Sequence, residues 1–406
     1  DSVASMRVRL IASAILLIGC SDGATEAPTS TGMSVADTCN FLDDDGDGAI
    51  DEGFDYEPGV WVNVGRTARF ASPTRSLSLA DGSIAVSWLD HFSTAGDKLA
   101  VVRVSPDGRT HAGPAFVELP APSAEQSGPV LREGVLHFIL GSNDWQDCTV
   151  GCPITFARFD AQTLALLETR ELAWATANGQ GILSTASCNA DVCVSSVVHA
   201  PTGKQGLLWS EPKTGALVRH TTSDAPAILH SLGDSALALQ ERFPTDDVPP
   251  SWSLRLRFLT TDGSADLFAP IELGACGAAL GPMAWSGDSV VLVHRMPSND
   301  KLQTVVRRFS SVDGLEIGEA VVVGDPGWTP SALVPFGSGF LLDGWAVPFS
   351  HQMRRLGADL RPLEEPHNAF DVSAYFYLEA LSLPAPVLIN SSYDGRSINI
   401  AEVACR

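Results

Sequence analysis

The sequence predicts an all-β fold, a seven-bladed β-propeller, and three observations support this prediction. Alternating apolar and polar residues are common from residue 60 onward, whereas the period of long helices is hard to find. The 36 Gly and 26 Pro residues are spread through the body, as expected for many short strands joined by turns. A pattern of Arg followed by an Asp turn also recurs about every fifty residues, the size of one four-stranded blade.

The recurring pattern places an Arg near the end of one strand and an Asp in the turn that follows. Its five copies are separated by 55, 99, 51 and 47 residues and begin at Arg103, Arg158, Arg257, Arg308 and Arg355. The spacing of 99 is a double step, with Trp209 in the gap. We expect these Arg side chains to be structural, pairing with turn Asp side chains or backbone carbonyls rather than with a substrate.

Seven apolar segments that follow turns predict the second strand of each blade, and they favour seven blades over six or eight. These segments are SIAVSWLD (83–90), GVLHFIL (134–140), DVCVSSVV (191–198), SALALQ (235–240), SVVLV (289–293), GFLLDGW (339–345) and APVLIN (385–390). The last copy ends one strand short, at residues 397–405, and residues 60–64 can supply the missing outer strand. The propeller is therefore expected to span residues 60–406, closed by an N-terminal strand. An irregular array of β-sandwiches is the alternative.

Residues 1–20 predict an export signal. Translation is expected to begin at Met6, with Arg7 and Arg9 ahead of an apolar stretch, Leu10–Ile18. That stretch is too short to span a bilayer as a permanent helix. Cys20 follows in the sequence LIGC, which resembles the lipobox of bacterial lipoproteins and implies lipidation of Cys20. An ordinary signal peptide is the alternative.

Residues 21–38 are small and polar, and they predict a flexible, disordered tether. Ser21 follows the lipobox cysteine, which among lipoproteins implies the outer membrane and leaves open whether the protein faces the periplasm or the surface. A lipid anchor holds a chain at a membrane by burying methylene groups, so no transmembrane helix is needed.

An acidic segment at residues 39–55 has the spacing of the first half of a D-x-D-x-D-G calcium loop. In such a loop alternate carboxylates converge on one cation, and Gly48 would permit the sharp turn. The predicted metal ligands are the side chains or carbonyls of Asp43, Asp45, Asp47, Ala49, Asp51 and Glu52. Phe54 occupies the usual place of the final Glu, so Glu52 is the expected substitute and Asp55 the second choice. A solvated acidic linker is the alternative.

This segment resembles the MopE-type metal-binding repeat of secreted bacterial proteins, CNxxDDDCDGxxDE. The matching residues are Cys39, Asn40, Asp43, Asp44, Asp45, Asp47, Gly48, Asp51 and Glu52. Gly46 replaces the second cysteine of the repeat, so the usual disulfide within the loop cannot form. The resemblance covers about one residue in twenty-five and implies metal binding. The family name suggests copper, whereas an oxygen-only ligand set suits calcium better.

The remaining cysteines are typical of an exported protein. Two pairs are close enough in sequence to join local turns or hairpins by disulfides: Cys148 with Cys152, and Cys188 with Cys193. Cys39 and Cys405 could tie the chain ends together, which would leave Cys276 over. The connectivity stays open, because spacing alone does not determine it.

Charge and motifs narrow the function without fixing it. The 26 Lys and Arg against 48 Asp and Glu give a net charge of −22, which opposes binding to nucleic acid. No serine-nucleophile, zinc-protease or phosphate-loop motif is present in the sequence. Three histidines, His91, His199 and His294, follow second strands and raise the possibility of a polar or metal-binding ring. Solvated loop positions are the simpler interpretation.

The sequence therefore predicts a lipid-anchored envelope protein that carries a calcium loop and a propeller scaffold for a protein or glycan partner. One alternative is a propeller enzyme that acts on polysaccharide or peptide, since propeller enzymes assemble their sites from different blades. Another is a protein that captures copper or another metal.

Overall fold

The structure is a computed structural model, and all the residues that it describes belong to one unit, residues 37–406. The described ranges are 56–58, 60–66, 74–90, 98–118, 125–141, 155–171, 181–188, 193–199, 204–211, 217–223, 227–232, 236–244, 252–260, 263–276, 281–298, 301–324, 327–336, 338–346, 350–363, 367–368, 378–381, 387–391 and 396–405. Within these ranges the fold is all β, and no helix could cross a membrane.

The described strands form seven antiparallel sheets, numbered here in chain order. Sheets 1 to 3 contain β3 (Arg75–Ser78), β4 (Ile84–Asp90), β5 (Lys98–Val104) and β6 (Thr110–Glu118); β7 (Glu125–Arg132), β8 (Val135–Gly141), β9 (Thr155–Asp160) and β10 (Leu166–Glu171); and β11 (Gly181–Cys188), β12 (Cys193–His199), β13 (Lys204–Ser210) and β14 (Leu217–Ser223). Sheets 4 and 5 contain β15 (Ala227–Leu232), β16 (Ala236–Pro244), β17 (Trp252–Thr260) and β18 (Ile271–Cys276); and β19 (Met283–Trp285), β20 (Ser289–Ser298), β21 (Lys301–Ser310) and β22 (Val321–Gly324). Sheets 6 and 7 contain β23 (Thr329–Phe336), β24 (Gly339–Ala346), β25 (Ser350–Leu356) and β26 (His367–Asn368); and β27 (Leu378–Leu381), β28 (Val387–Ser391) and β29 (Ser397–Cys405), with β1 (Tyr56–Pro58) and β2 (Val62–Arg66).

Each of the seven apolar segments found in the sequence forms the second strand of a separate sheet. Where their side chains are described, these strands carry buried apolar residues on both faces, because a neighbouring sheet covers each face. In β4, for example, Ile84, Val86 and Trp88 pack toward sheet 7, whereas Ala85 and Leu89 pack toward sheet 2. Two successive cores therefore share one strand.

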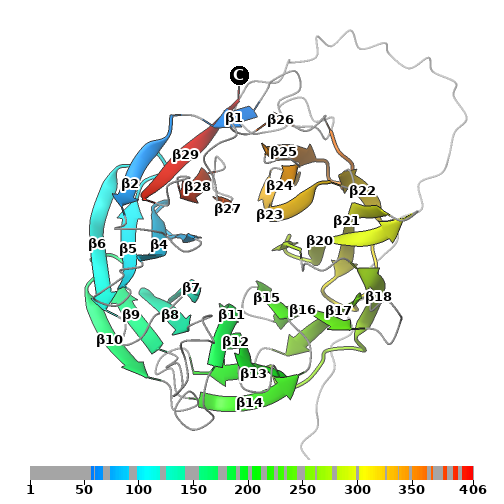
Figure 1. Ribbon diagram of the computed structural model, residues 1–406, viewed down its shortest axis with the longest axis horizontal. Coiled ribbons are helices and arrows are strands. Elements are labelled where there is room, and N and C mark those ends of the chain that lie inside the picture. The colour runs from blue at the N-terminus through cyan, green and yellow to red at the C-terminus, as the bar shows by residue number, and fades with distance from the viewer. Residues whose placement is uncertain are drawn as a thin grey trace, which may run out of the picture. The chain divides into compact units, whose positions relative to one another are not determined.

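The first strands of consecutive sheets contact one another in the order β3, β7, β11, β15, β19, β23 and β27, and β27 also contacts β3. In Figure 1 the sheets follow one another around a common centre, with these first strands nearest to it. Trp209, which stands where an Arg copy is missing, lies on β13, the third strand of sheet 3. The double Arg spacing therefore spans one complete additional sheet.

Sheet 7 joins the two ends of the described chain, since β2 pairs with β29. Asn63 lies opposite Asn399, and its Nδ2 donates to the Asn399 Oδ1 at 3.3 Å. Gly65 lies against the Trp88 ring, and a Cβ there would come within 2.4 Å of the ring, so this close approach requires glycine. The N-terminal strand thereby packs on both sheet 7 and sheet 1.

Two details at this junction differ from the expectation. The pairing strand is Val62–Arg66 rather than residues 60–64, and a second short strand, β1, precedes it. The reason is the length of β29, which extends beyond the residues that pair with β2, so that Val403, Ala404 and Cys405 pair with β1. Two short strands therefore share the edge of one long strand.

Candidate functional site

The predicted metal ligands Asp43, Asp45, Asp47, Ala49, Asp51 and Glu52, and the lipidation residue Cys20, lie outside the described residues. His91 and the pair Cys148 and Cys152 lie outside them as well. Among the residues that are described, no group of three or more His, Cys, Asp or Glu side chains could hold a metal ion. The calcium loop thus remains a prediction from the sequence.

The repeated Arg residues make structural contacts wherever their partners are described. Arg103 donates from Nε to the Ser83 hydroxyl at 2.8 Å and pairs with the Asp81 carboxylate, both in the turn between β3 and β4. Its Nη1 also donates to the Gln162 carbonyl of sheet 2 at 3.0 Å. One guanidinium therefore joins two adjacent sheets, as expected for an Arg that binds turn carboxylates and carbonyls.

The turn Asp residues bind their own turns rather than the repeated Arg. Asp107, Asp160, Asp313 and Asp359 each accept a hydrogen bond from the backbone N–H two residues further along. At Asp313, the Ser310 hydroxyl and the backbone N–H of Leu315 lower the pKa of the carboxyl. Turns of this kind explain the recurring Asp without any role in binding.

Sheets 4 and 5 contain a matched pair of ion pairs. Arg257 Nε and Nη2 donate to the Asp266 carboxylate at 2.8 and 3.0 Å. Arg307 donates in the same way to Glu316, nine residues later, at 2.7 and 2.5 Å. The sequence repeat had selected Arg308 instead, but that side chain lies over the Phe340 ring of sheet 6, 5.7 Å from its centroid. Adjacent residues of a strand point to opposite faces of the sheet, so Arg307 faces Glu316 whereas Arg308, one position later, faces Phe340.

Arg257 differs from Arg307 in one respect, because it also contacts a buried carboxylate. The Glu241 side chain is 4% exposed and lies 3.3 Å from Arg257 Nη1 and 3.9 Å from Arg255 Nη1. Burial raises the pKa of Glu241, and the two guanidinium groups oppose that rise. A carboxyl with a raised pKa is a common feature of catalytic sites, but ion-pair networks produce the same effect.

His294 is buried rather than solvated. It lies on β20 with 1% exposure, on the same strand face as Leu292, which packs against sheet 4. Neither ring nitrogen has a hydrogen-bond partner among the described residues, and burial lowers its pKa to about 4. Gln240 lies on the face of sheet 4 that packs against sheet 5, and it is also buried. Its amide lacks a hydrogen-bond partner within the described part of the chain. His294 therefore belongs to the core between two sheets, and the simpler interpretation as a solvated loop residue was wrong for it.

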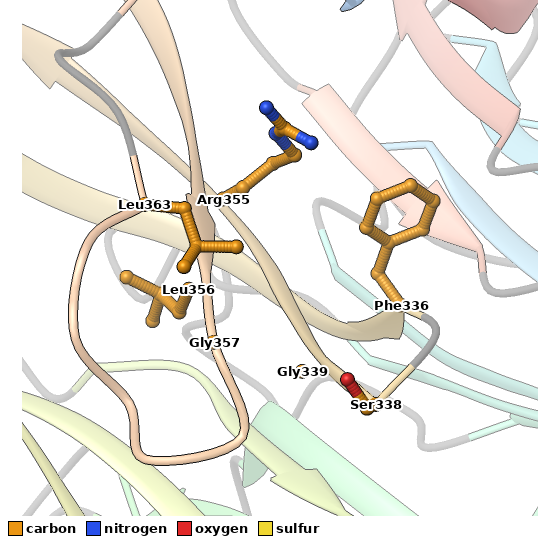
Figure 2. Close-up of a pocket in the computed structure, with 7 residues that line it drawn as sticks. All are labelled: Phe336, Ser338, Gly339, Arg355, Leu356, Gly357 and Leu363. Atoms are coloured by element: carbon orange, nitrogen blue, oxygen red, sulfur yellow. The ribbon is translucent and has the colours of Figure 1, made fainter. Parts of the chain in front are cut away.

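A small pocket lies at one end of sheet 6, lined by Phe336, Ser338, Gly339, Arg355, Leu356, Gly357 and Leu363. Its empty volume is about 230 Å³, including space open to solvent. Figure 2 shows Phe336 and Leu363 on opposite sides of it, with the Arg355 side chain at its edge. Sites for whole small molecules usually have about 300–1,000 Å³, so this pocket is a shallow depression and not a small-molecule site.

A regular set of aliphatic residues on three sheets, one of which lines this pocket, was not predicted from the sequence. In sheets 4, 5 and 6, the turn after the third strand folds back and donates a backbone hydrogen bond to that strand. The three donors are Leu267, to Phe258 at 2.8 Å; Ile317, to Arg308 at 2.8 Å; and Leu363, to Arg355 at 3.1 Å. The equal spacing of Leu267 and Ile317 from their acceptors was visible in the sequence, but only backbone pairing shows that all three are equivalent.

No family model matches the chain, and no curated protein matches it either. Solved structures do match. The β-propeller domain of the Trilobed protease from Pyrococcus furiosus, described as having an open velcro topology, has a TM-score of 0.51 at 8% identity over 83% of this chain and 98% of its own. The Dos1 propeller has a TM-score of 0.52 at 12% identity over 86% and 95%. Acylaminoacyl peptidase from Pyrococcus horikoshii has a TM-score of 0.50 at 10% identity over 82% of this chain but only 52% of its own. At these identities the likeness shows the fold alone, a propeller-like all-β fold.

Proposed function

We propose that this protein is a seven-bladed propeller that serves as a binding scaffold in the bacterial cell envelope. The observation that carries the proposal is the cycle of contacts between first strands, from β3 through β27 and back to β3, with both chain ends in sheet 7. Such an arrangement holds its turns rigidly and presents them to partners, since sites on rigid elements keep their geometry. The anchor is the lipid on Cys20, and the partner is a protein or a glycan.

The acidic loop would bind calcium and fix the start of the propeller. Its predicted ligands precede β1 and β2, the strands that pair with β29. Calcium removal is then expected to lower the melting temperature of the full chain, because an ion that binds only the folded state stabilises it. Calorimetric titration in detergent, repeated with Asp45→Ala and Asp47→Ala, checks this, and copper serves as the second metal. Copper binding without calcium binding would favour the metal-capture alternative.

The scaffold itself is tested by immobilising the full chain and measuring retention of envelope glycan fragments and of peptides, while product formation is followed in the same samples. Saturable retention without product formation supports a scaffold. Membrane fractionation and labelling with a palmitate analogue, with Cys20→Ala as control, test the anchor. Soluble, unlabelled protein would reject it.

A propeller that assists peptide hydrolysis is the second candidate function. Two similar structures, the Trilobed protease domain and the acylaminoacyl peptidase, come from peptidases. This chain spans about half of the acylaminoacyl peptidase. Protein-dependent peptide cleavage in the retention assay would replace the scaffold with this function.

A further inference from the structure

The surface of interest runs across three adjacent sheets and is called here the aliphatic row: Leu267, Ile317 and Leu363. Their side chains are exposed to nearly the same extent, 45%, 44% and 46%. Two more aliphatic residues of the sheet 5 turn, Val312 and Leu315, are exposed by 82% and 67%. Single exposed aliphatic residues are ordinary, but equivalent ones on consecutive sheets form a repeated surface.

The turns that carry the row are in contact with one another. Gly314 of the sheet 5 turn lies beneath Phe268 of the sheet 4 turn, because a Cβ on Gly314 would come within 2.3 Å of that ring. In the sheet 6 turn, Leu360 is buried in the same core cluster as Val323 of β22 in sheet 5. The turns of sheets 4 and 5 therefore pack on each other, and the sheet 6 turn packs on the core that it shares with sheet 5.

The pocket on sheet 6 is a shallow depression at one end of the row. Leu363 belongs both to the row and to the pocket lining, opposite Phe336 (Figure 2). Apolar side chains at the middle of a contact usually contribute most to binding, surrounded by contacts of smaller effect.

The charges around the row indicate the sign of the charge that its partner carries. Asp288, Asp313 and Glu319 are exposed on sheet 5, and none of them forms an ion pair with any described residue. The nearby cations Arg257, Arg307 and Arg361 are each paired with a carboxylate. Arg308 lies over the Phe340 ring, and Arg355 at the edge of the pocket is only 8% exposed. Among the exposed residues around the row, the charge without an ion pair is thus negative. A second copy of this chain or an anionic lipid surface would be repelled.

We infer that the aliphatic row binds a basic, amphipathic protein segment, one that presents apolar side chains to the row and pocket and Lys or Arg to the carboxylates. This inference rests on the proposed scaffold function and names the class of its partner. Apolar contacts provide the affinity, and the carboxylates increase the association rate and exclude acidic segments.

The test uses the full chain and a synthetic peptide that alternates Leu with Lys, with binding measured by fluorescence anisotropy. The variant is Leu267→Ser/Ile317→Ser/Leu363→Ser. The matched control is Leu166→Ser/Leu167→Ser, since those residues have comparable exposures of 47% and 51% on sheet 2. Neither variant changes the net charge, so non-specific attraction to the basic peptide is the same in both. Circular dichroism confirms that each variant is folded.

We expect the triple variant to weaken peptide binding about tenfold or more and the control to leave it unchanged. A peptide that alternates Leu with Glu should not bind. The inference is overturned if both variants bind the peptide like the unmodified chain, if both lose it equally, or if the acidic peptide binds as well. Vesicle binding or self-association that the triple variant removes, without an effect on the peptide, would assign the row to those occupants instead. If the triple variant retains the glycans or peptides of the scaffold assay, the row is rejected while the scaffold function stands.

Discussion

Replacement of Arg257 by Met is expected to destabilise the fold more than the same replacement of Arg307. The two residues occupy equivalent positions in adjacent sheets, and each binds a partly exposed carboxylate through two hydrogen bonds. Only Arg257 also contacts a buried carboxylate, that of Glu241. The difference between the two variants therefore measures the cost of leaving that carboxylate without its main partner.

The magnitudes follow from the exposure of the groups left behind. Without Arg307, the Glu316 side chain is 31% exposed and can be hydrated, so the loss is about 1 kcal/mol. Without Arg257, the Glu241 side chain is 4% exposed and retains only Arg255, at 3.9 Å. Breaking a buried pair costs about 3–5 kcal/mol, and the remaining Arg places this case at about 3 kcal/mol. The expected difference is about 2 kcal/mol.

The pH dependence of folding stability also distinguishes the Arg257→Met variant from the Arg307→Met variant. Burial raises the pKa of Glu241 above its ordinary 4.5, and the nearby Arg257 opposes that rise. In the Arg257→Met variant the folded state should therefore take up a proton more readily than the unfolded state, so its stability increases as the pH falls from neutral toward 4.5. Arg307 lowers the pKa of Glu316, so that pair keeps its contribution until the pH falls below 4.5.

The assay is urea denaturation of Arg257→Met, Arg307→Met and Arg257→Met/Glu241→Gln at about pH 8 and about pH 5.5. A raised carboxyl pKa predicts that Arg257→Met loses less stability at the lower pH. The double variant should recover most of the lost stability, because a neutral amide is easier to bury than a charge. Equal losses in the two Arg variants, or no recovery in the double variant, would refute the assignment of Glu241 as the source of the difference.

Three further outcomes are expected. Folding stability should fall as the pH drops from 6.5 toward 4, because burial lowers the pKa of His294 to about 4 and the unfolded chain binds the proton more strongly. His294→Leu should reduce this slope in denaturation curves recorded across that range, and buried His137, whose pKa is also lowered to about 4, should maintain the rest. Gly314→Ala should destabilise the fold by more than about 1 kcal/mol, because its Cβ would clash with the Phe268 ring, whereas Gly318→Ala has a similar positive φ but nothing within 4 Å of its Cβ and should cost only the backbone strain. Equal melting temperatures of the two variants would contradict this. Cys188 and Cys193 lie directly opposite each other in β11 and β12. Facing residues of antiparallel strands have Cα atoms about 4.5–5.5 Å apart, which a disulfide can span, so non-reducing peptide mapping of exported protein should recover one linked peptide, and two free thiols would refute the bond.

The sequence by itself determined the elements and their repetition. The seven apolar second strands and the final repeat that ends one strand short, at β29, were all predicted, because side-chain alternation and turn residues are local properties. Trp209, in the gap of the double Arg spacing, lies in a sheet of its own, sheet 3. The calcium loop follows from local spacing and lipidation of Cys20 from the resemblance to a lipobox, and both stay predictions.

Only the tertiary structure decided which side chains meet. Arg307 rather than Arg308 binds Glu316, because one step along a strand reverses the direction of a side chain. His294 is buried because sheet 4 covers its face, a fact that depends on residues some fifty positions earlier. The aliphatic row exists because three turns fold back onto their strands at the same point. Contacts between distant segments depend on packing, and no local pattern encodes them.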